Sequence, residues 1–145
     1  MPRNDSDENY VLNLCDKVLG QTSSRQHQFD FLVGDTNTKG TAVRLPVDSY
    51  YDRLKLVIEY RERQHSESVK FFDKPDRITV SGVHRGEQRK IYDERRRQVL
   101  PQHGIKLIEI SYSDFHHDQQ RRIIRDAKFD EKVVRKKLHN FIRKV

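Results

Sequence analysis

Residues 46–61 read Pro46-Val47-Asp48-Ser49-Tyr50-Tyr51-Asp52-Arg53-Leu54-Lys55-Leu56-Val57-Ile58-Glu59-Tyr60-Arg61. Apolar and aromatic residues dominate this stretch except at Asp52-Arg53, which predicts two antiparallel strands, Thr41–Tyr51 and Leu54–Arg61, joined by a short turn. Successive side chains of a strand point to opposite faces, so Glu59 should share one face with Val57 and Arg61. The other face should carry Leu56, Ile58 and Tyr60.

The sequence before this hairpin predicts a helix and a further strand. Apolar residues recur at spacings of three and four over Asp7–Leu19, which favours a helix capped by Ser6 or Asp7 and ended by Gly20. The aromatic-rich segment Gln28–Gly34 is predicted as a strand that completes an antiparallel meander, and Thr36–Gly40 has the composition of a turn. Pro46, inside the second strand, suggests an edge position or a bulge.

The sequence after the hairpin predicts a crossover. Residues 65–83 read as a loop, and helical periodicity then covers Arg85–Gln102 before the apolar strand Ile105–Ser111. A strand, a helix and a strand in succession place the last strand in the same sheet. The remainder is expected to be helical, with one apolar stripe at Ile123, Ile124 and Ala127, a second from Val134 onward, and Asp130 as a cap.

The predicted fold class is therefore α/β, a mixed sheet of an antiparallel meander plus a crossover strand, flanked by helices and followed by a basic C-terminal helical tail. A length of 145 residues suits a single domain over 1–145, with an N-terminal helix in 1–20, a core in 28–111 and C-terminal helices in 114–145. No apolar run reaches the roughly 18 residues of a membrane span. The polar N-terminus argues against a secretory signal, and the single Cys15 excludes an internal disulfide, so a cytoplasmic protein is expected.

The charge is unevenly distributed. The net charge is +7, but residues 1–20 carry two basic and four acidic side chains, whereas residues 116–145 carry ten basic and four acidic ones. Residues 85–97 add six basic and three acidic side chains. A basic second half is typical of a phosphate-bearing partner, although a solvated helix surface has the same composition.

The chemistry centres on Asp48 and Glu59. A short turn at Asp52-Arg53 would lay Asp48 across from the region of Glu59, so that two carboxylates converge beside a cation. Such a pair can bind a hard divalent cation, which leaves coordination positions for water and a phosphate. The alternative is a surface hairpin in which Glu59 pairs with Arg61 or Lys55.

Asp48, the hairpin and the apolar strand ending in Glu59-Tyr60-Arg61 resemble the PD-(D/E)xK nuclease superfamily. Gln64-His65, Tyr92-Asp93-Glu94-Arg95-Arg96 and His103-Gly104-Ile105-Lys106-Leu107-Ile108 resemble more narrowly its branch related to the very-short-patch-repair endonuclease. The resemblance covers about residues 29–111 and implies a restriction-endonuclease-like core, Mg²⁺ with Mn²⁺ as a substitute, and hydrolysis of double-stranded DNA in restriction or repair. It implies Asp48 and Glu59 as metal ligands. A homodimer is compatible with cutting of both strands, although the sequence identifies no dimer surface.

This chain departs from the family pattern at two positions. Val47 separates Pro46 from Asp48, and Arg61 stands where many members have lysine. Arginine stays protonated, so Arg61 can hold a phosphate or stabilise developing charge but cannot act as a general base. His65 is the better base, and Gln64 could orient water or contact the metal. Glu62 is expected to point away from Glu59 if the strand continues, and Glu8 is interpreted first as a helix-start charge and second as a further acid near the site.

The basic segments are expected to contact DNA. The residues assigned to the approach to the scissile strand are Arg85, Arg89, Lys90, Arg95 and Arg96. Those assigned to flanking phosphates are Arg135, Lys136, Lys137, Arg143 and Lys144. Two alternative sites are rejected. Pro75-Asp76 with Glu87 has a similar pattern, but Glu87 begins a polar helix rather than ending an apolar strand. A metal site at His116-His117-Asp118 is not expected, because adjacent side chains point in different directions.

Two other functions stay open. A catalytically inactive nuclease-fold module would bind DNA without cutting it, and the arginine in place of lysine at position 61 favours it. A protein-interaction subunit would instead use the amphipathic C-terminal helix to dock a partner.

Overall fold

Four strands form one sheet in the order β1-β2-β3-β4 in the computed structural model, which describes residues 6–63 and 85–142. The strands are β1 (Ser24–His27), β2 (Val47–Tyr51), β3 (Leu56–Arg61) and β4 (Lys106–Ser111). The pairs β1–β2 and β2–β3 are antiparallel, whereas β3–β4 is parallel. The predicted α/β class, with a meander and a crossover strand in one mixed sheet, is confirmed.

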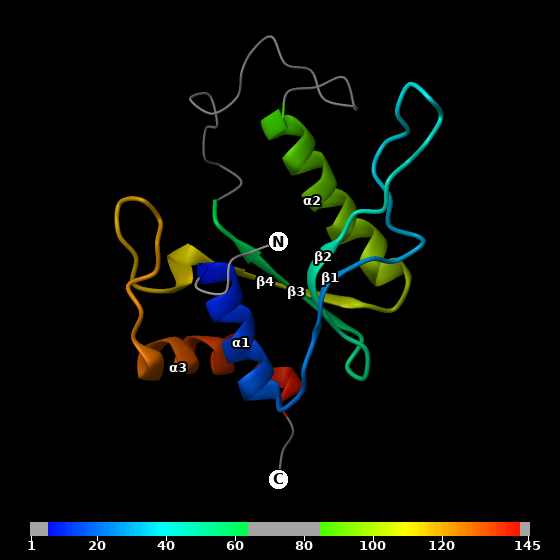
Figure 1. Ribbon diagram of the computed structural model, residues 1–145. Helices are drawn as coiled ribbons and strands as arrows, with labels where there is room; N and C mark the ends of the chain where they lie inside the picture. The colour runs from blue at the N-terminus through cyan, green and yellow to red at the C-terminus, as the bar shows by residue number, and fades with distance from the viewer. Residues whose placement is uncertain (1–5, 64–84, 143–145) are drawn as a thin grey trace.

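Helices cover both faces of this sheet (Figure 1). Helix α2 (Arg85–Gln102) connects β3 to β4 and packs on one face, while α1 (Asp7–Leu19) and α3 (Ala127–Lys137) pack together on the other. Two short 3₁₀ turns complete the described chain. The first, η1 (Tyr112–Asp114), directly follows β4, and the second, η2 (His139–Phe141), follows α3. No helix within the described ranges combines the length and apolar character needed to cross a membrane.

Strand β3 is the centre of the core, and its side chains alternate as predicted. Leu56, Ile58 and Tyr60 are buried with residues of α1 and α3, whereas Val57 is buried with Leu100 of α2. Each face of the strand therefore has its own helical layer. Since Glu59 lies on the Val57 face, its carboxylate is directed into the layer between the sheet and α2.

The predicted ends of α1 are confirmed. The side chain of Ser6 accepts a 3.0 Å hydrogen bond from the backbone N–H of Asn9, which caps the first turn. Gly20 ends the helix in the left-handed conformation at φ 66° and satisfies carbonyls of the last turn. The predicted bounds of α2 are confirmed as well.

Two predicted strands are wrong in position. The first strand is Ser24–His27, not Gln28–Gly34, where the chain turns and Phe31 stacks on His103 at 3.6 Å between ring centroids. The second strand begins only at Val47, directly after Pro46, so Pro46 marks a strand start rather than an edge or a bulge. The aromatic pattern of residues 28–34 thus reflects packing against the sheet rather than a strand within it.

The C-terminal region also differs from its prediction. Residues 115–126 contain no helix, and Ile123 instead forms an isolated bridge with His117. The cap of α3 is Asp126, whose side chain accepts from the backbone of Phe129, not Asp130. Asp130 is fully buried and accepts hydrogen bonds from the Tyr10 hydroxyl and the Asp126 amide. The loop interpretation of residues 65–83 lies outside the described residues.

Candidate active site

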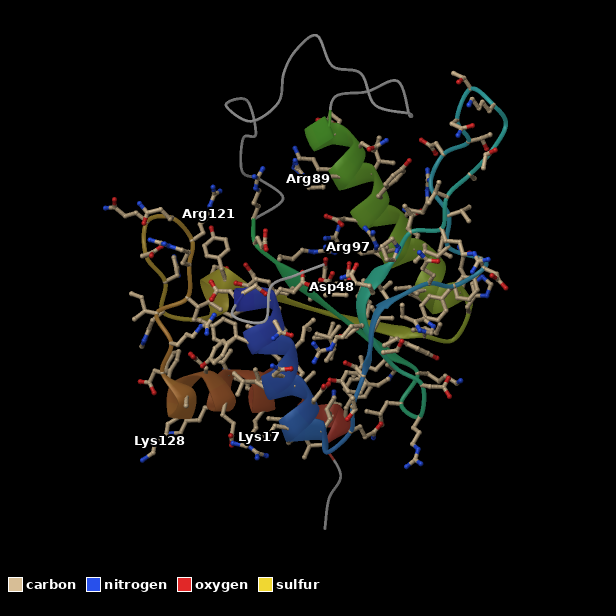
Figure 2. All side chains as sticks on the ribbon, viewed as in Figure 1. Lys17, Asp48, Arg89, Arg97, Arg121 and Lys128 are labelled. Carbon is tan, nitrogen blue, oxygen red and sulfur yellow. The ribbon has the colours of Figure 1, made fainter. Side chains whose placement is uncertain are left out.

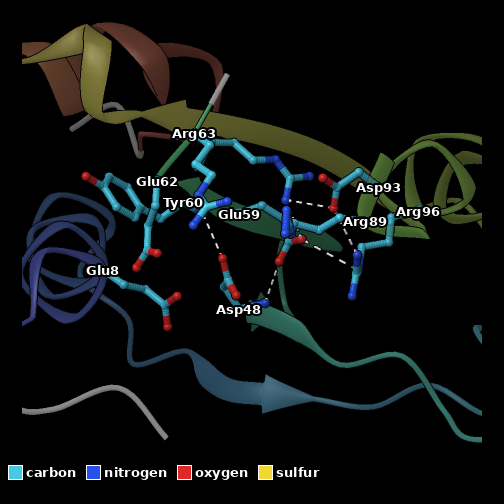
Figure 3. A pocket seen from close by; sticks show the side chains of 10 residues that line it. Glu8, Asp48, Glu59, Tyr60, Glu62, Arg63, Arg89, Asp93 and Arg96 are labelled. Carbon is cyan, nitrogen blue, oxygen red and sulfur yellow. Dashed lines mark hydrogen bonds and ion pairs between the residues drawn. The ribbon is translucent and has the colours of Figure 1, made fainter. Parts of the chain in front are cut away.

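Strands β2 and β3 exchange side-chain hydrogen bonds where their backbone ladder ends. The ladder pairs Ser49 with Ile58, and one step beyond it the amide of Asp48 donates to Glu59 Oε2 at 2.6 Å. The amide of Tyr60 donates to Asp48 Oδ2 at 2.8 Å. Each carboxylate therefore occupies a backbone donor of the opposite strand, and the structure brings the two predicted acids together (Figure 3).

Burial makes both carboxylates reluctant to ionise. The side chain of Glu59 is only 3% exposed. Burial, reinforced by the neighbouring charge of Asp48, raises the pKa of Glu59 to about 7. Burial, reinforced by Glu8, raises the pKa of Asp48 to about 6. A positive charge close to Asp48 and Glu59 would stabilise their ionised forms.

Two further acids face the same space. Glu8 and Glu62 line an open pocket of about 380 Å³ together with Asp48 and Glu59. Burial, followed by the charges of Glu62 and Glu59, raises the pKa of Glu8. Glu8 thus fits both of its interpretations, as a residue of the first turn of α1 and as an acid of the site. The expectation that Glu62 points away from Glu59 applied only if the strand continued, and this condition is not met, because β3 ends at Arg61.

Basic side chains also line the pocket. Arg61, Arg63, Arg89 and Arg96 line it with Asp93, and Figure 3 shows Glu8, Glu62 and Asp48 gathered apart from Arg96 and Asp93. The pocket is therefore lined by both carboxylates and guanidinium groups. Such a mixed lining can hold a divalent cation beside a phosphate.

Asp93 bridges two of these arginines. Its Oδ1 accepts from Nη1 of Arg61 at 3.0 Å and from Nη1 of Arg96 at 3.0 Å. The same two guanidinium groups lie 3.4 and 3.6 Å from Oε1 of Glu59. Two acids and two arginines thus alternate in one buried cluster, which was not predicted from the sequence. The signal was the spacing of Asp93 and Arg96, which puts both on one helix face.

Arg61 also forms a hydrogen bond with a residue of β4. Its Nε donates to Oε1 of Glu109 at 2.8 Å, and Arg97 donates to both oxygens of Glu109 at 2.9 and 2.7 Å. Although burial opposes the shift, these hydrogen bonds from Arg97 and Arg61 lower the pKa of Glu109 to about 2. Glu109 was also missed, although a single acid inside the apolar segment Lys106–Ser111 is an identifiable signal.

The predicted DNA contacts of α2 separate into two groups. Arg89 and Lys90 are exposed, and Arg89 lines the pocket. Arg95 instead donates to Asp35 at 2.7 Å and to the Val33 carbonyl, which fixes a loop. Arg96 is mostly buried and donates to the Pro46 carbonyl as well as to Asp93. The side chain of Arg85, and the residues Gln64, His65, Pro75 and Asp76, lie outside the described part of the chain.

The C-terminal cations lie on another element. Arg135, Lys136 and Lys137 belong to the last turn of α3, in the helical layer on the opposite side of the sheet from α2, and none lines the pocket. Arg135 pairs with Glu131 at 3.0 Å, and Lys137 pairs with Asp114 at 3.3 Å. Arg143 and Lys144 lie outside the described residues.

Within the described residues no group of three or more His, Cys, Asp or Glu side chains is arranged to hold a metal ion. The pair Asp48 and Glu59 nevertheless has suitable chemistry, since Mg²⁺ is commonly bound by one or two carboxylates and completes its shell with water and phosphate oxygens. Burial is the largest cause of their raised pKa values, and Arg61 and Arg96 already offset part of their negative charge.

No protein-family model matches the chain, and no solved structure matches it. A protein of Frog virus 3 (isolate Goorha) named "Uncharacterized protein 094L" is 40% identical over 73 residues, which are 50% of this chain and 43% of that protein. The chain thus covers less than half of the length of this relative.

Proposed function

We propose that this chain is a metal-dependent nuclease that hydrolyses phosphodiester bonds of double-stranded DNA. The observation that carries the proposal is the convergence of Asp48 and Glu59, through reciprocal strand-to-strand hydrogen bonds, in a pocket that arginines also line. Carboxylates and guanidinium groups in one pocket suit a phosphodiester, whose hydrolysis needs both a metal ion and stabilisation of developing negative charge.

In this proposal Asp48 and Glu59 bind Mg²⁺ or Mn²⁺ in their ionised forms. The bound ion would polarise the phosphodiester and lower the pKa of a coordinated water. Glu59 is held by the Asp48 amide and by its proximity to Arg61 and Arg96, so its oxygens are positioned before substrate arrives. Glu8 lines the same pocket, and its pKa, raised by burial, suits a group that accepts a proton from water.

Arg89 and Arg63 are the arginines assigned to the phosphate, since both line the pocket and Arg89 is exposed on α2. Arg61 and Arg96 serve in this proposal as a positive layer behind the carboxylates, and Asp93 positions them. The surplus of positive charge in residues 85–97 supports a polyanionic substrate.

The family proposed for this nuclease is the PD-(D/E)xK superfamily, in its restriction-endonuclease-like form. Two features support this assignment: both acids stand on adjacent strands of a meander, and α2 crosses over to a parallel β4. Arg61, in the position of the usual lysine, is the main departure.

The test is cleavage of supercoiled plasmid with Mg²⁺ or Mn²⁺. Asp48→Asn and Glu59→Gln should each reduce the rate at least about a hundredfold while the protein stays folded. Glu94→Gln, a change of an exposed acid on α2, is the matched control and should cut at the wild-type rate. Wild-type cleavage by both site variants would refute the proposal.

A second candidate function is a DNA-binding module without nuclease activity. It is favoured by Arg61, whose guanidinium lies within 3.4 Å of carboxylate oxygens of Glu59, Asp93 and Glu109. This candidate predicts DNA binding that weakens with salt, no cleavage with either metal ion, and no loss of binding in Glu59→Gln. Cleavage gained by Arg61→Lys would indicate that the arginine alone blocks the chemistry.

A further inference from the structure

Two loops far apart in the sequence are built on the same turn. In the first, the Asn37 side chain accepts from the amides of Lys39 and Thr41, both at 2.9 Å, and the Asn37 amide donates to the Thr41 carbonyl at 2.8 Å. Gly40 completes this turn at φ 80° and donates to the Asn37 carbonyl. We call residues 33–44, closed by the bridge between Val33 and Arg44, the first hairpin.

The second loop repeats this pattern bond for bond. The Asp118 side chain accepts from the amides of Gln120 and Arg122 at 2.9 and 3.0 Å, and the Asp118 amide donates to the Arg122 carbonyl at 2.9 Å. Arg121 takes the place of the glycine at φ 65° and donates to the Asp118 carbonyl. Residues 116–125 form the second hairpin. Side-chain-anchored turns of this kind present the following residues in a fixed geometry.

Each turn is followed at the same distance by an exposed apolar side chain. Val43 stands six residues after Asn37 and is 68% exposed, and Ile124 stands six residues after Asp118 and is 57% exposed. These two are the large apolar residues most exposed to solvent within the described ranges. An exposed arginine accompanies each one, Arg44 beside Val43 and Arg122 two residues before Ile124.

The first hairpin is attached to α2, beside the pocket. Arg95 donates to Asp35 at 2.7 Å, and the Asp35 amide donates to the hydroxyl of Tyr92 at 3.0 Å. Tyr92 and Arg95 directly flank Asp93 and Arg96, which line the pocket.

The second hairpin is attached to α1, on the other side of the pocket. The Ile123 amide donates to Asp7 at 2.9 Å, and the guanidinium of Arg125 lies over the Tyr10 ring and pairs with Asp7 at 3.2 Å. Asp7 directly precedes Glu8, which lines the pocket. In Figure 2, Arg121 of this hairpin and Arg89 of α2 lie apart from each other above Asp48.

We propose that the two hairpins are a pair of arms that hold double-stranded DNA across the pocket, with Val43 and Ile124 against the sugars of a groove and Arg44 and Arg122 on backbone phosphates. This inference rests on the proposed function, because the pocket fixes where the duplex lies. An apolar side chain beside an arginine suits a nucleic-acid groove, which offers sugar surface next to phosphate. The chemistry also agrees with the positive charge of the chain.

The test is binding of a fluorescently labelled short DNA duplex, measured by anisotropy at several salt concentrations without divalent metal ions. The arm variants are Val43→Ser with Arg44→Ser, and Ile124→Ser with Arg122→Ser. All four side chains are exposed, and the ion pairs of Arg44 with Asp30 and of Arg122 with Asp118 lie at the surface, so thermal unfolding should match the wild type. Lys128→Ser, which removes one exposed cation of α3, is the control matched to each arm variant in charge.

Each arm variant should weaken duplex binding about tenfold and reduce the salt dependence by about one phosphate contact, whereas the α3 control should change neither by as much. Val43→Ser and Ile124→Ser alone should weaken binding without changing the salt dependence. Arm variants that bind like the wild type, or an α3 control that loses more affinity than they do, would overturn the proposal. Equal affinity for a duplex of RNA would overturn the assignment to DNA.

The outcomes also separate this inference from the proposed function. Wild-type protein that binds duplex through the arms but does not cut with Mg²⁺ or Mn²⁺ refutes the nuclease and leaves the arms standing. Wild-type protein that cuts, and whose arm variants bind and cut equally well, refutes the arms alone. Wild-type protein that neither binds nor cuts refutes both.

Discussion

The backbone amide of Asp48 donates a 2.6 Å hydrogen bond to Oε2 of Glu59, so the acid on β3 fastens the strand that carries the other acid. Glu59 is therefore part of the fold as well as of the candidate site. Substitution by glutamine should separate these two roles. The amide oxygen of glutamine can accept the hydrogen bond in place of the carboxylate, but it lacks the negative charge that a metal ligand needs here.

The first prediction separates these contributions. Glu59→Gln keeps an acceptor for the Asp48 amide, whereas Glu59→Ala leaves this part-buried donor without one. We expect the alanine variant to be less stable than the glutamine variant by about 1–3 kcal/mol, measured by urea unfolding at neutral pH. Both should lose metal-dependent cleavage. Equal stability of the two variants would show that this hydrogen bond does not support the strand pair.

The second prediction concerns pH. The folded-state pKa values of Asp48 and Glu59 are raised to about 6 and about 7, above their ordinary values of 3.8 and 4.5. The folded state therefore holds these protons more tightly than the unfolded state. Their contribution to stability is complete below about pH 4, decreases as the pH rises through the folded pKa values, and is constant above about pH 7 to 8.

A divalent cation should reverse this loss, because it binds the ionised carboxylates. Addition of Mg²⁺ should raise the unfolding temperature of the wild type more at pH 8 than at pH 5, values on either side of the folded pKa range of about 6 to 7. The double variant Asp48→Asn/Glu59→Gln should show neither the pH-dependent decrease from these groups nor the Mg²⁺ effect. An equal Mg²⁺ effect in wild type and double variant would place the ion elsewhere.

The third prediction concerns Asp93. Its carboxylate accepts from both Arg61 and Arg96 at 3.0 Å, in a layer where all three side chains are at most 14% exposed. Asp93→Asn removes the charge that two buried arginines share, so we expect a loss of about 3 kcal/mol in the free energy of unfolding. Glu94→Gln changes the adjacent residue, whose side chain is 55% exposed, and should stay within about 0.5 kcal/mol of the wild type. Chemical denaturation of both variants measures the difference, and similar losses would contradict the role of Asp93.

The sequence predicts those parts of the fold whose residues are buried on a regular period. Strand β3 alternates between two buried faces, and α1 carries one apolar stripe between Ser6 and Gly20. Both ends of α1 could therefore be predicted, and β3 was predicted apart from its start, which lies at Leu56 and not at Leu54. Strand β1 has no such pattern. It is a polar edge strand, and it is fixed through Arg25, which pairs with Asp16 of α1 at 2.9 Å. That contact depends on tertiary structure and leaves no local signal.

The candidate site follows the same division. Asp48 and Glu59 could be paired from the hairpin alone, because a short turn fixes the register of two adjacent strands. Glu8 and Arg89 could not be placed with them from spacing, since they belong to helices on opposite faces of the sheet and meet only at the pocket. Asp93 and Glu109 were missed because their pairing with Arg61 depends on tertiary structure. Their local signals, the spacing of Asp93 from Arg96 and the position of Glu109 inside strand β4, show that the residues are unusual but not which partner they meet.

The fourth prediction compares two buried tyrosines. The hydroxyl of Tyr60 has no hydrogen-bond partner among the described residues, although the residue is only 4% exposed. The hydroxyl of Tyr51, which is 1% exposed, donates to the carboxylate of Asp16. An unpaired buried hydroxyl costs free energy, whereas a paired one contributes about 1 kcal/mol or more. Tyr60→Phe should therefore be neutral or stabilising, and Tyr51→Phe should destabilise by about 1–2 kcal/mol. Urea unfolding of the two variants under one set of conditions measures the order, and a larger loss for Tyr60→Phe would mean that its hydroxyl is paired in solution.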